Sequence, residues 1–155
     1  MSAAGAVTAG VLAFAAACGP APEEGPAPAQ IVADSLGLGP GERVHEVRIL
    51  HRNGRERAEP DSLEVRPGDR VDFTGADGRA RVVTFPRAGV AAAPRDFLDG
   101  SAVHRSPPLL GRDVHWVVPF RAAPEGRYPF TVSGSGADGA GVVIVRVPEG
   151  RRRGR

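Results

Sequence analysis

Four histidines are the side chains of this chain best suited to bind a metal ion. His45 and His51 share a face of one alternating segment, but a strand rises about 3.3 Å per residue and separates them by roughly 20 Å, too far to share an ion. We expect both to be surface residues at strand ends. His115 points away from its neighbour Trp116, the better core candidate, and is expected to face solvent. The alternative to a surface role is that His104 and His115 together bind a metal ion or another ligand. Two imidazoles without a carboxylate make a weak metal site.

The sequence gives little support for catalysis by a serine nucleophile. Ser133 and Ser135 lie near Asp138 in the sequence and could contribute to nucleophilic catalysis beside a histidine. No Gly-x-Ser-x-Gly turn between a strand and a helix places either serine next to a base. The segment from residue 133 to 141 is instead expected to be a short flexible connection. We therefore assign no catalytic residue and expect a protein that is not an enzyme.

Arginine supplies all 20 basic residues, against 18 acidic ones. Four of these arginines occupy the last five positions, so residues 1–150 carry a net charge of −2. This balance excludes a dedicated nucleic-acid binder, and the absence of lysine excludes Schiff-base chemistry. Arg79, Arg81 and Arg87 could bind an anion or an acidic partner surface, but a solvated strand edge is the simpler interpretation.

The elements that would position these side chains are short strands. A chain of 155 residues with 21 glycines and 15 prolines fits one core, and from residue 43 onward its β-branched runs are typical of an all-β sandwich. Residues 86–111, interrupted by Pro94, Pro107 and Pro108, are expected to form a long loop with one helical turn near residues 96–98. The expected strands cover residues 44–51, 63–65, 71–73, 82–85, 114–118, 128–132 and 142–147, the last of them central because both of its faces are apolar.

The N-terminal residues predict export. Residues 3–17 are uncharged and apolar to small, too short to span a bilayer, and typical of a secretory signal peptide over residues 1–17. The sequence AAAC ending at Cys18 resembles the lipobox of bacterial lipoproteins, which implies that Cys18 is acylated and anchors a periplasmic or otherwise extracytoplasmic protein to the membrane. An export signal with an incidental cysteine is the alternative. Residues 18–42, rich in Pro, Ala and Gly, are expected to form a tether, and residues 149–155 a basic disordered tail.

Four segments in order resemble a plastocyanin-type or azurin-type cupredoxin. SLEVRPGDRVDF (residues 62–73) is similar to the strand, Pro-Gly-Asp turn and strand that lead into the copper site of that family. RVVTF (81–85) matches its His-x-Val-x-Phe strand, GRYPF (126–130) its Gly-x-Tyr-x-Phe strand, and GVVIVRV (141–147) its closing strand. The resemblance covers residues 43–148 and implies a Greek-key β-sandwich. An immunoglobulin-type sandwich is the alternative, but it lacks its cysteine pair here.

The resemblance ends at the copper ligands. The positions of the family's histidine, cysteine, second histidine and methionine fall on Arg81, Val132, Ser135 and Gly139. No small shift of the alignment restores a ligand, because residues 52–103 and 116–155 contain no His, Cys or Met. The resemblance therefore implies a cupredoxin-like domain that has lost its type-1 copper site and needs no cofactor. We expect a binding or structural module with an envelope protein as partner. A copper-binding electron carrier with non-standard ligands is the alternative.

Overall fold

The structure is a computed structural model that describes residues 38–39, 41–112 and 114–148. The predicted signal peptide, Cys18, the tether up to residue 37 and the basic tail lie outside the described residues. The described elements, in chain order, are β1 (Val44–Arg52), β2 (Arg55–Glu59), β3 (Ser62–Val65), β4 (Arg70–Gly75), β5 (Ala80–Thr84), α2 (Ala92–Ser101), β6 (Leu109–Leu110), β7 (His115–Pro119), β8 (Gly126–Ser133) and β9 (Gly139–Val145).

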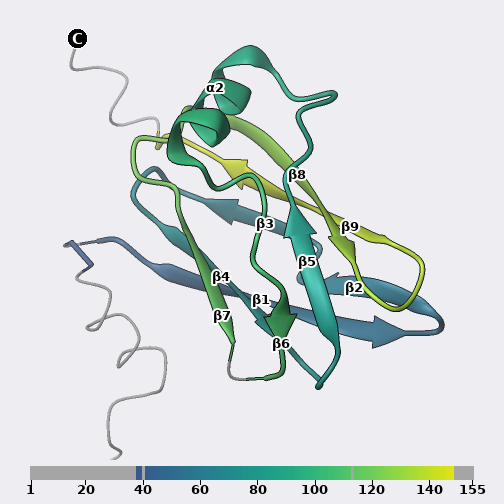
Figure 1. Cartoon of the computed structure of the whole chain (residues 1–155). Coiled ribbons are helices and arrows are strands. Elements are labelled where there is room, and N and C mark those ends of the chain that lie inside the picture. Colours follow the sequence, from purple (N-terminus) through teal and green to yellow (C-terminus); the bar gives the residue numbers. More distant parts are fainter. Residues whose placement is uncertain (1–37, 40, 113, 149–155) are drawn as a thin grey trace, which may run out of the picture.

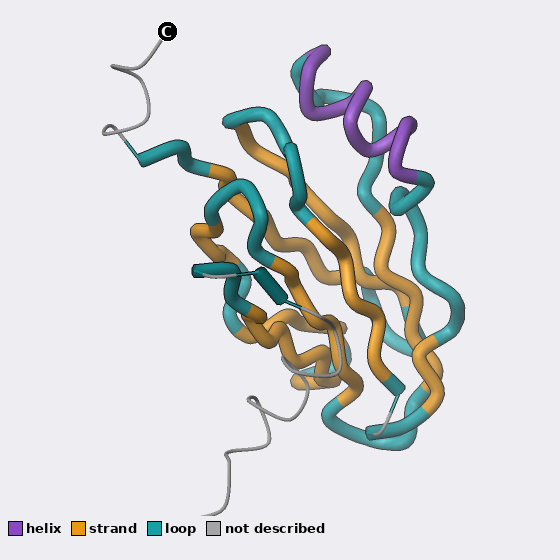
Figure 2. The backbone as a smooth tube through the Cα atoms, turned by 90° about the vertical axis from the view of Figure 1, so that its left-hand side faces the viewer, coloured by secondary structure: helices purple, strands orange, loops and turns teal. Residues whose placement is uncertain are grey.

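The strands form two facing sheets, one ordered β2-β1-β4-β7 and the other β3-β9-β8-β5-β6 (Figures 1 and 2). The chain crosses between the sheets after β2, β3, β4, β6 and β7, whereas β1–β2, β5–β6 and β8–β9 are neighbours within one sheet. The β1–β4 and β3–β9 pairs run parallel, and the other strand pairs run antiparallel. The prediction of an all-β sandwich is confirmed. Strand β9 pairs with β3 on one side and β8 on the other, so its predicted central place is also confirmed.

Alternating apolar residues from both sheets fill the space between them. Phe73 of β4 is fully buried and packs against Phe130 of β8, with ring centroids 5.2 Å apart, and against Trp116 of β7 at 5.5 Å. Trp116 is partly buried against this core, as its alternation with His115 predicts. A second group of rings, formed by Phe97, Phe120 and Tyr128, lies where α2 covers one end of the sandwich.

The Pro67-Gly68-Asp69 turn joins β3 to β4 as expected. Gly68 adopts a φ of 109°, a conformation that favours glycine because it has no Cβ. The buried Asp69 carboxylate accepts hydrogen bonds from the backbone N–H groups of Arg66 at 2.9 Å and Arg43 at 3.1 Å. The turn therefore ties the start of β1 to the start of β4.

Two predictions about the connections are wrong. Residues 86–111 are not one long loop with a single helical turn, because they contain the ten-residue helix α2 and the short strand β6. Strand β2 was not expected. It follows β1 through a two-residue turn in which Asn53 and Gly54 both have positive φ, the geometry that matches the twist of a hairpin.

Candidate functional site

Arg81 lies inside the sandwich. Strand β5 alternates so that Arg81 and Val83 both point inward, and the Arg81 side chain is 0% exposed. Its Nε donates to Glu56 Oε2 at 2.6 Å, and its two terminal nitrogens donate to the two carboxylate oxygens of Asp77 at 2.7 and 2.9 Å. The interpretation of Arg81 as part of a solvated strand edge is therefore wrong. A buried guanidinium needs paired carboxylates, and the structure supplies two.

Glu56 is the second buried charge of this cluster. It occupies an inward position of β2, and its side chain is 0% exposed. Its Oε1 accepts a hydrogen bond from the backbone N–H of Gly136 at 3.1 Å and lies 3.1 Å from His51 Nδ1. Burial acts to raise the pKa of Glu56, but the hydrogen bonds from Arg81 and His51 outweigh it and the pKa is lowered. Glu56 is therefore ionised at neutral pH.

Arg81 and both of its carboxylate partners stay charged in the buried cluster. Burial acts to lower the pKa of Arg81, but its hydrogen bonds to Asp77 and Glu56 outweigh burial and raise it. The same guanidinium holds the pKa of Asp77 well below its ordinary range. Arg81 is thus a permanent cation between two carboxylates, one buried and one about a third exposed.

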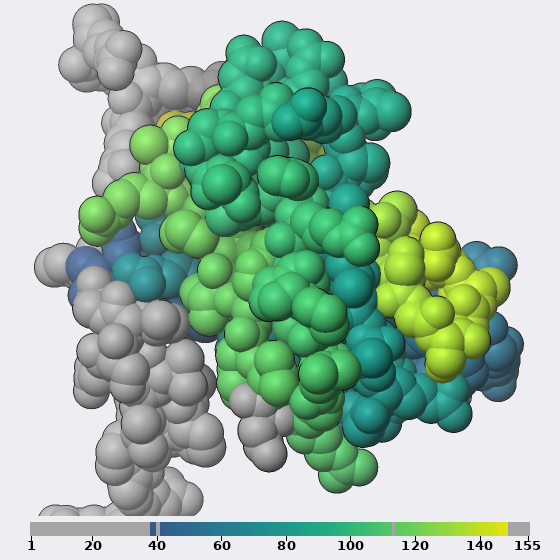
Figure 3. Space-filling model, in the orientation of Figure 1, coloured from purple at the N-terminus to yellow at the C-terminus, as the bar shows by residue number. Residues whose placement is uncertain are grey.

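The β8–β9 connection closes over Glu56 and is not a free turn. The backbone N–H of Glu56 donates to the carbonyl of Ala137 at 2.9 Å, and the N–H of Ala137 donates to the carbonyl of Gly54 at 3.0 Å. A Cβ at Gly134 would lie 2.7 Å from Glu56 Oε1, and one at Gly139 would lie 2.2 Å from the Glu56 carbonyl oxygen. Figure 3 shows this segment, in yellow, packed beside the blue β1–β2 hairpin. The segment that was expected to be a flexible connection is thus hydrogen-bonded to β2 and to the turn before it.

The four positions that the family resemblance assigns to copper ligands lie in and around this cluster. Arg81 bonds to Glu56, Gly139 abuts the Glu56 backbone, and Ser135 Oγ accepts a hydrogen bond from Arg79 at 3.1 Å. Val132 is fully buried opposite Val83 in the neighbouring strand. A type-1 copper ion needs imidazole and thiolate ligands, whereas these side chains supply a cation, a hydroxyl and hydrocarbon. The residues present do not fit copper.

The two histidines of β1 are not simple surface residues. Both are partly buried, and each faces a buried carboxylate: His51 faces Glu56, and His45 Nε2 lies 2.9 Å from Asp69 Oδ2. The expectation that they share no site is consistent with these separate partners. The partner acids come from a turn and from an unexpected strand, so sequence alternation along β1 did not reveal them.

His104 and His115 are not brought into one site. His115 is about half exposed, as predicted, and its Nδ1 lies 2.8 Å from Oδ2 of the buried Asp72 on β4. His104 is exposed beside the other sheet, where its carbonyl accepts a hydrogen bond from the N–H of Phe85 at 2.8 Å. Within residues 38–39, 41–112 and 114–148, no three His, Cys, Asp or Glu side chains form a group able to hold a metal ion.

The remaining candidate arginines and serines do not come together in one site. Arg87 is exposed and pairs with Asp99 of α2 at 2.8 Å, so it does not join Arg79 and Arg81 in one cluster. No hydrogen bond joins a serine hydroxyl to a histidine in the described part of the chain, and Ser135 bonds to Arg79 instead. A shallow groove runs over the outer side of β5 beside these residues, lined by Arg79, Ala80, Arg81, Val82, Pro108, Ser133, Gly134 and Ser135.

This chain is similar to known proteins in structure but matches none in the sequence comparisons. No family model and no curated protein matches the sequence. Oxidised plastocyanin from the fern Dryopteris crassirhizoma is 17% identical with a TM-score of 0.45, and covers 66% of this chain and 100% of its own. A mutant amicyanin is 21% identical with a TM-score of 0.45, covering 72% and 89%.

Pseudoazurin from Methylobacterium extorquens is 22% identical with a TM-score of 0.42, covering 68% of this chain and 76% of its own. These three proteins are cupredoxins, the family that the sequence motifs resemble. All three TM-scores are below 0.5, and the β-sandwich assignment rests on the strand pairing given above.

Proposed function

We propose that this protein is an exported, lipid-anchored β-sandwich that acts as a binding or structural module at the cell envelope and carries no type-1 copper. The observation that carries the proposal is the buried Arg81–Glu56 pair, closed by the β8–β9 connection. It puts a fixed cation and its counter-ions where the family resemblance calls for metal ligands. A protein built this way is not an electron carrier.

The buried cluster is also a poor catalytic centre. The Arg81 side chain and both Glu56 oxygens are engaged, and the Glu56 side chain is 0% exposed. A general acid or base must reach a substrate proton, which a fully enclosed carboxylate does not. We therefore propose a structural role for the pair and a non-enzymatic role for the protein. The groove over β5, next to the 63% exposed Leu110, offers one surface for an envelope protein.

The envelope location is supported by the sequence. The apolar run before Cys18 and the tether after it fit a lipoprotein that holds its domain off the membrane. Among the described residues, none of the helices has the length and apolar character needed to cross a membrane. The attachment that the proposal names is an acyl group on Cys18.

The anchoring claim is tested by expressing the full chain and its Cys18→Ser variant in a bacterial host. Mass spectrometry of the purified protein should show loss of residues 1–17 and a lipid on Cys18, and fractionation should place the wild type in the membrane pellet. The variant should leave that pellet. An unmodified wild-type protein with the same distribution as Cys18→Ser would overturn the anchor.

A further inference from the structure

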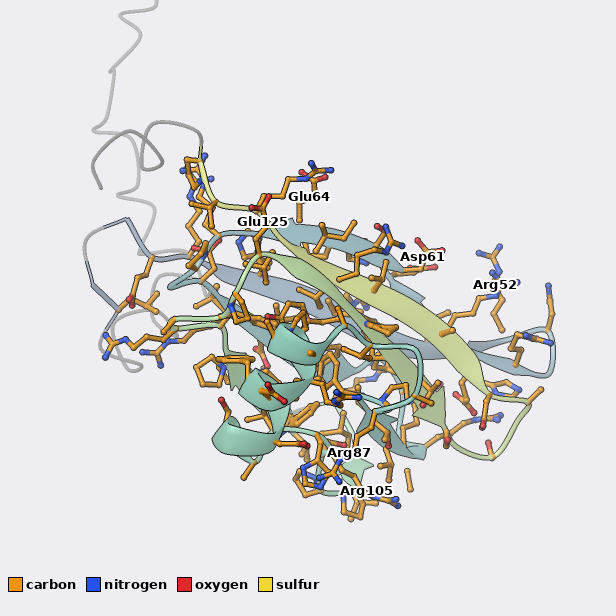
Figure 4. The ribbon with its side chains drawn as sticks, turned by 90° about the horizontal axis from the view of Figure 1, so that it is seen from above. Arg52, Asp61, Glu64, Arg87, Arg105 and Glu125 are labelled. Carbon is orange, nitrogen blue, oxygen red and sulfur yellow. The ribbon has the colours of Figure 1, made fainter. Side chains whose placement is uncertain are left out.

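One face of the β1–β2 hairpin is rich in arginine. The inward residues of the hairpin, among them Ile49 and Ala58, are buried, so the alternate residues of both strands point outward. Figure 4 shows Arg52 projecting from this end of the molecule, away from Arg87 and Arg105. The outward residues between positions 48 and 59 are Arg48, Leu50, Arg52, Arg55, Arg57 and Glu59, all exposed except the half-buried Leu50.

Two of these arginines lie directly opposite each other across the hairpin. Arg52 pairs directly with Arg55, and Arg57 lies opposite Leu50. Like charges placed opposite each other on a sheet are destabilising, so folding alone does not favour this arrangement. Arg48 lies opposite Glu59. Glu46 of β1 shares this outward face, so the face carries four arginines and two acids.

The arginines of this face are not held in ion pairs. In the part of the chain that the structure describes, Arg48, Arg52, Arg55 and Arg57 make no ion pair. Other arginines do have partners, such as Arg87 with Asp99 and Arg146 with Glu64. An excess of unpaired arginines on a short hairpin makes a surface suited to an external anion.

We propose that the arginine face of the β1–β2 hairpin binds the anionic headgroups of a lipid bilayer and so orients the domain on the membrane. This proposal rests on the proposed function, because a tethered domain stays within reach of the bilayer. The argument for lipid is charge complementarity over an open face. Four guanidinium groups spread along two strands match a continuous layer of phosphates, each of which accepts paired N–H donors.

The inference predicts binding to acidic vesicles. We would use Cys18→Ser protein, which has no acyl chain, and measure co-sedimentation with vesicles of phosphatidylcholine containing about 30% phosphatidylglycerol, and with vesicles of phosphatidylcholine alone. Each arginine near an anionic surface strengthens partitioning by about fivefold. The double variant Arg55→Gln/Arg57→Gln should therefore bind acidic vesicles about 25-fold more weakly.

A matched control removes the same charge elsewhere. Arg95 of α2 and Arg127 of β8 are exposed and lie away from the hairpin. The double variant Arg95→Gln/Arg127→Gln should keep wild-type affinity for acidic vesicles. Neither double variant should unfold at a lower urea concentration than the wild type, since both change exposed side chains and Arg55→Gln relieves the Arg52–Arg55 repulsion.

Three outcomes would overturn the inference. The first is equal binding to acidic and neutral vesicles, which would assign the affinity to the apolar N-terminal run. The second is an equal loss in the two double variants, which would make net charge the cause. The third is no vesicle binding together with retention on immobilised polyglutamate that needs Arg55 and Arg57, which would make an acidic protein the ligand. None of these results depends on acylation, so a failed anchor and a failed arginine face can be told apart.

Discussion

Replacing Arg81 with leucine is expected to destabilise the protein by about 3–5 kcal/mol at pH 7, because it leaves a buried charge without its main partner. Of the two carboxylates that Arg81 binds, Asp77 is 34% exposed and can be rehydrated, whereas Glu56 is 0% exposed. The lost stability therefore comes mainly from Glu56, whose carboxylate would retain only its hydrogen bonds with His51 and the Gly136 N–H. Urea unfolding measures this change in the free energy of unfolding. Trp116 fluorescence reports on the transition, since Trp116 is the single tryptophan and packs on Phe73.

The stability lost in Arg81→Leu should become smaller as the pH falls. In the wild type the pKa of Glu56 is lowered from 4.5, so its contribution to stability is present above that value and is lost as the pH falls through the folded pKa. Without Arg81, burial dominates and the pKa of Glu56 rises above 4.5. The variant then relaxes by protonating Glu56. The difference between variant and wild type should therefore shrink between pH 7 and about pH 4.5.

The double variant Arg81→Leu/Glu56→Leu is the control. Replacing both members of a buried pair by apolar residues of similar size is often neutral or stabilising. We expect the double variant to recover most of the stability lost in Arg81→Leu. A single variant within 1 kcal/mol of wild type, or a cost that stays constant from pH 7 to 4.5, would refute the reasoning about the buried pair.

Three further substitutions test the surrounding structure, each by urea unfolding. Gly139→Ala should destabilise the protein by about 1–3 kcal/mol, because the new Cβ would clash with the Glu56 carbonyl oxygen. Wild-type stability of this variant would mean that the β8–β9 connection is loosely held. Asp69→Ala should cost about 2–3 kcal/mol through lost hydrogen bonds to the turn, and a cost below 0.5 kcal/mol would contradict that role. Tyr128→Phe should cost about 1 kcal/mol, because the phenol donates to the Pro124 carbonyl at 2.8 Å. Burial raises the pKa of Tyr128, the single tyrosine, so phenolate absorbance should appear only on unfolding as the pH passes 10, and phenolate in the folded protein at that pH would contradict its burial.

Alternation and turn residues were enough to predict most strands. Val47 and Ile49 alternate with charged residues, and β1 forms around them. The Pro67-Gly68-Asp69 turn is where its residue types require it. Both features are local, because each residue's role depends on neighbours within a few positions.

The buried cluster was missed because its residues look like surface residues in the sequence. Strand β2 reads Arg-Glu-Arg-Ala-Glu, and Glu56 points inward where an apolar residue is normally expected. The burial of Arg81 depends on Glu56 and on Asp77, which lie 25 and 4 residues away. The Asn-Gly pair before β2 was the available signal, since that dipeptide favours a two-residue hairpin and would have placed Glu56 on the inward face.

Helix α2 lacked a starting signal. The residue before it is Ala91, which provides no side-chain hydrogen bond to the first turn, and Pro94 suggested a break. Proline is tolerated in the first turn of a helix, where the backbone N–H has no partner within the helix. Packing of Phe97 on Phe120 and Tyr128 stabilises the helix, and a contact of that kind is not visible in the local sequence.

Copper titration of the purified protein tests the central claim most directly. The account predicts no stoichiometric copper binding and no intense visible thiolate-to-copper absorption, because the four positions that the resemblance assigns to ligands carry Arg81, Val132, Ser135 and Gly139, and Arg81 is paired with Glu56. Wild-type protein and the His104→Ala/His115→Ala variant would be titrated side by side. Tight one-to-one binding by the wild type would contradict the account, and its loss in the variant would identify the alternative ligands.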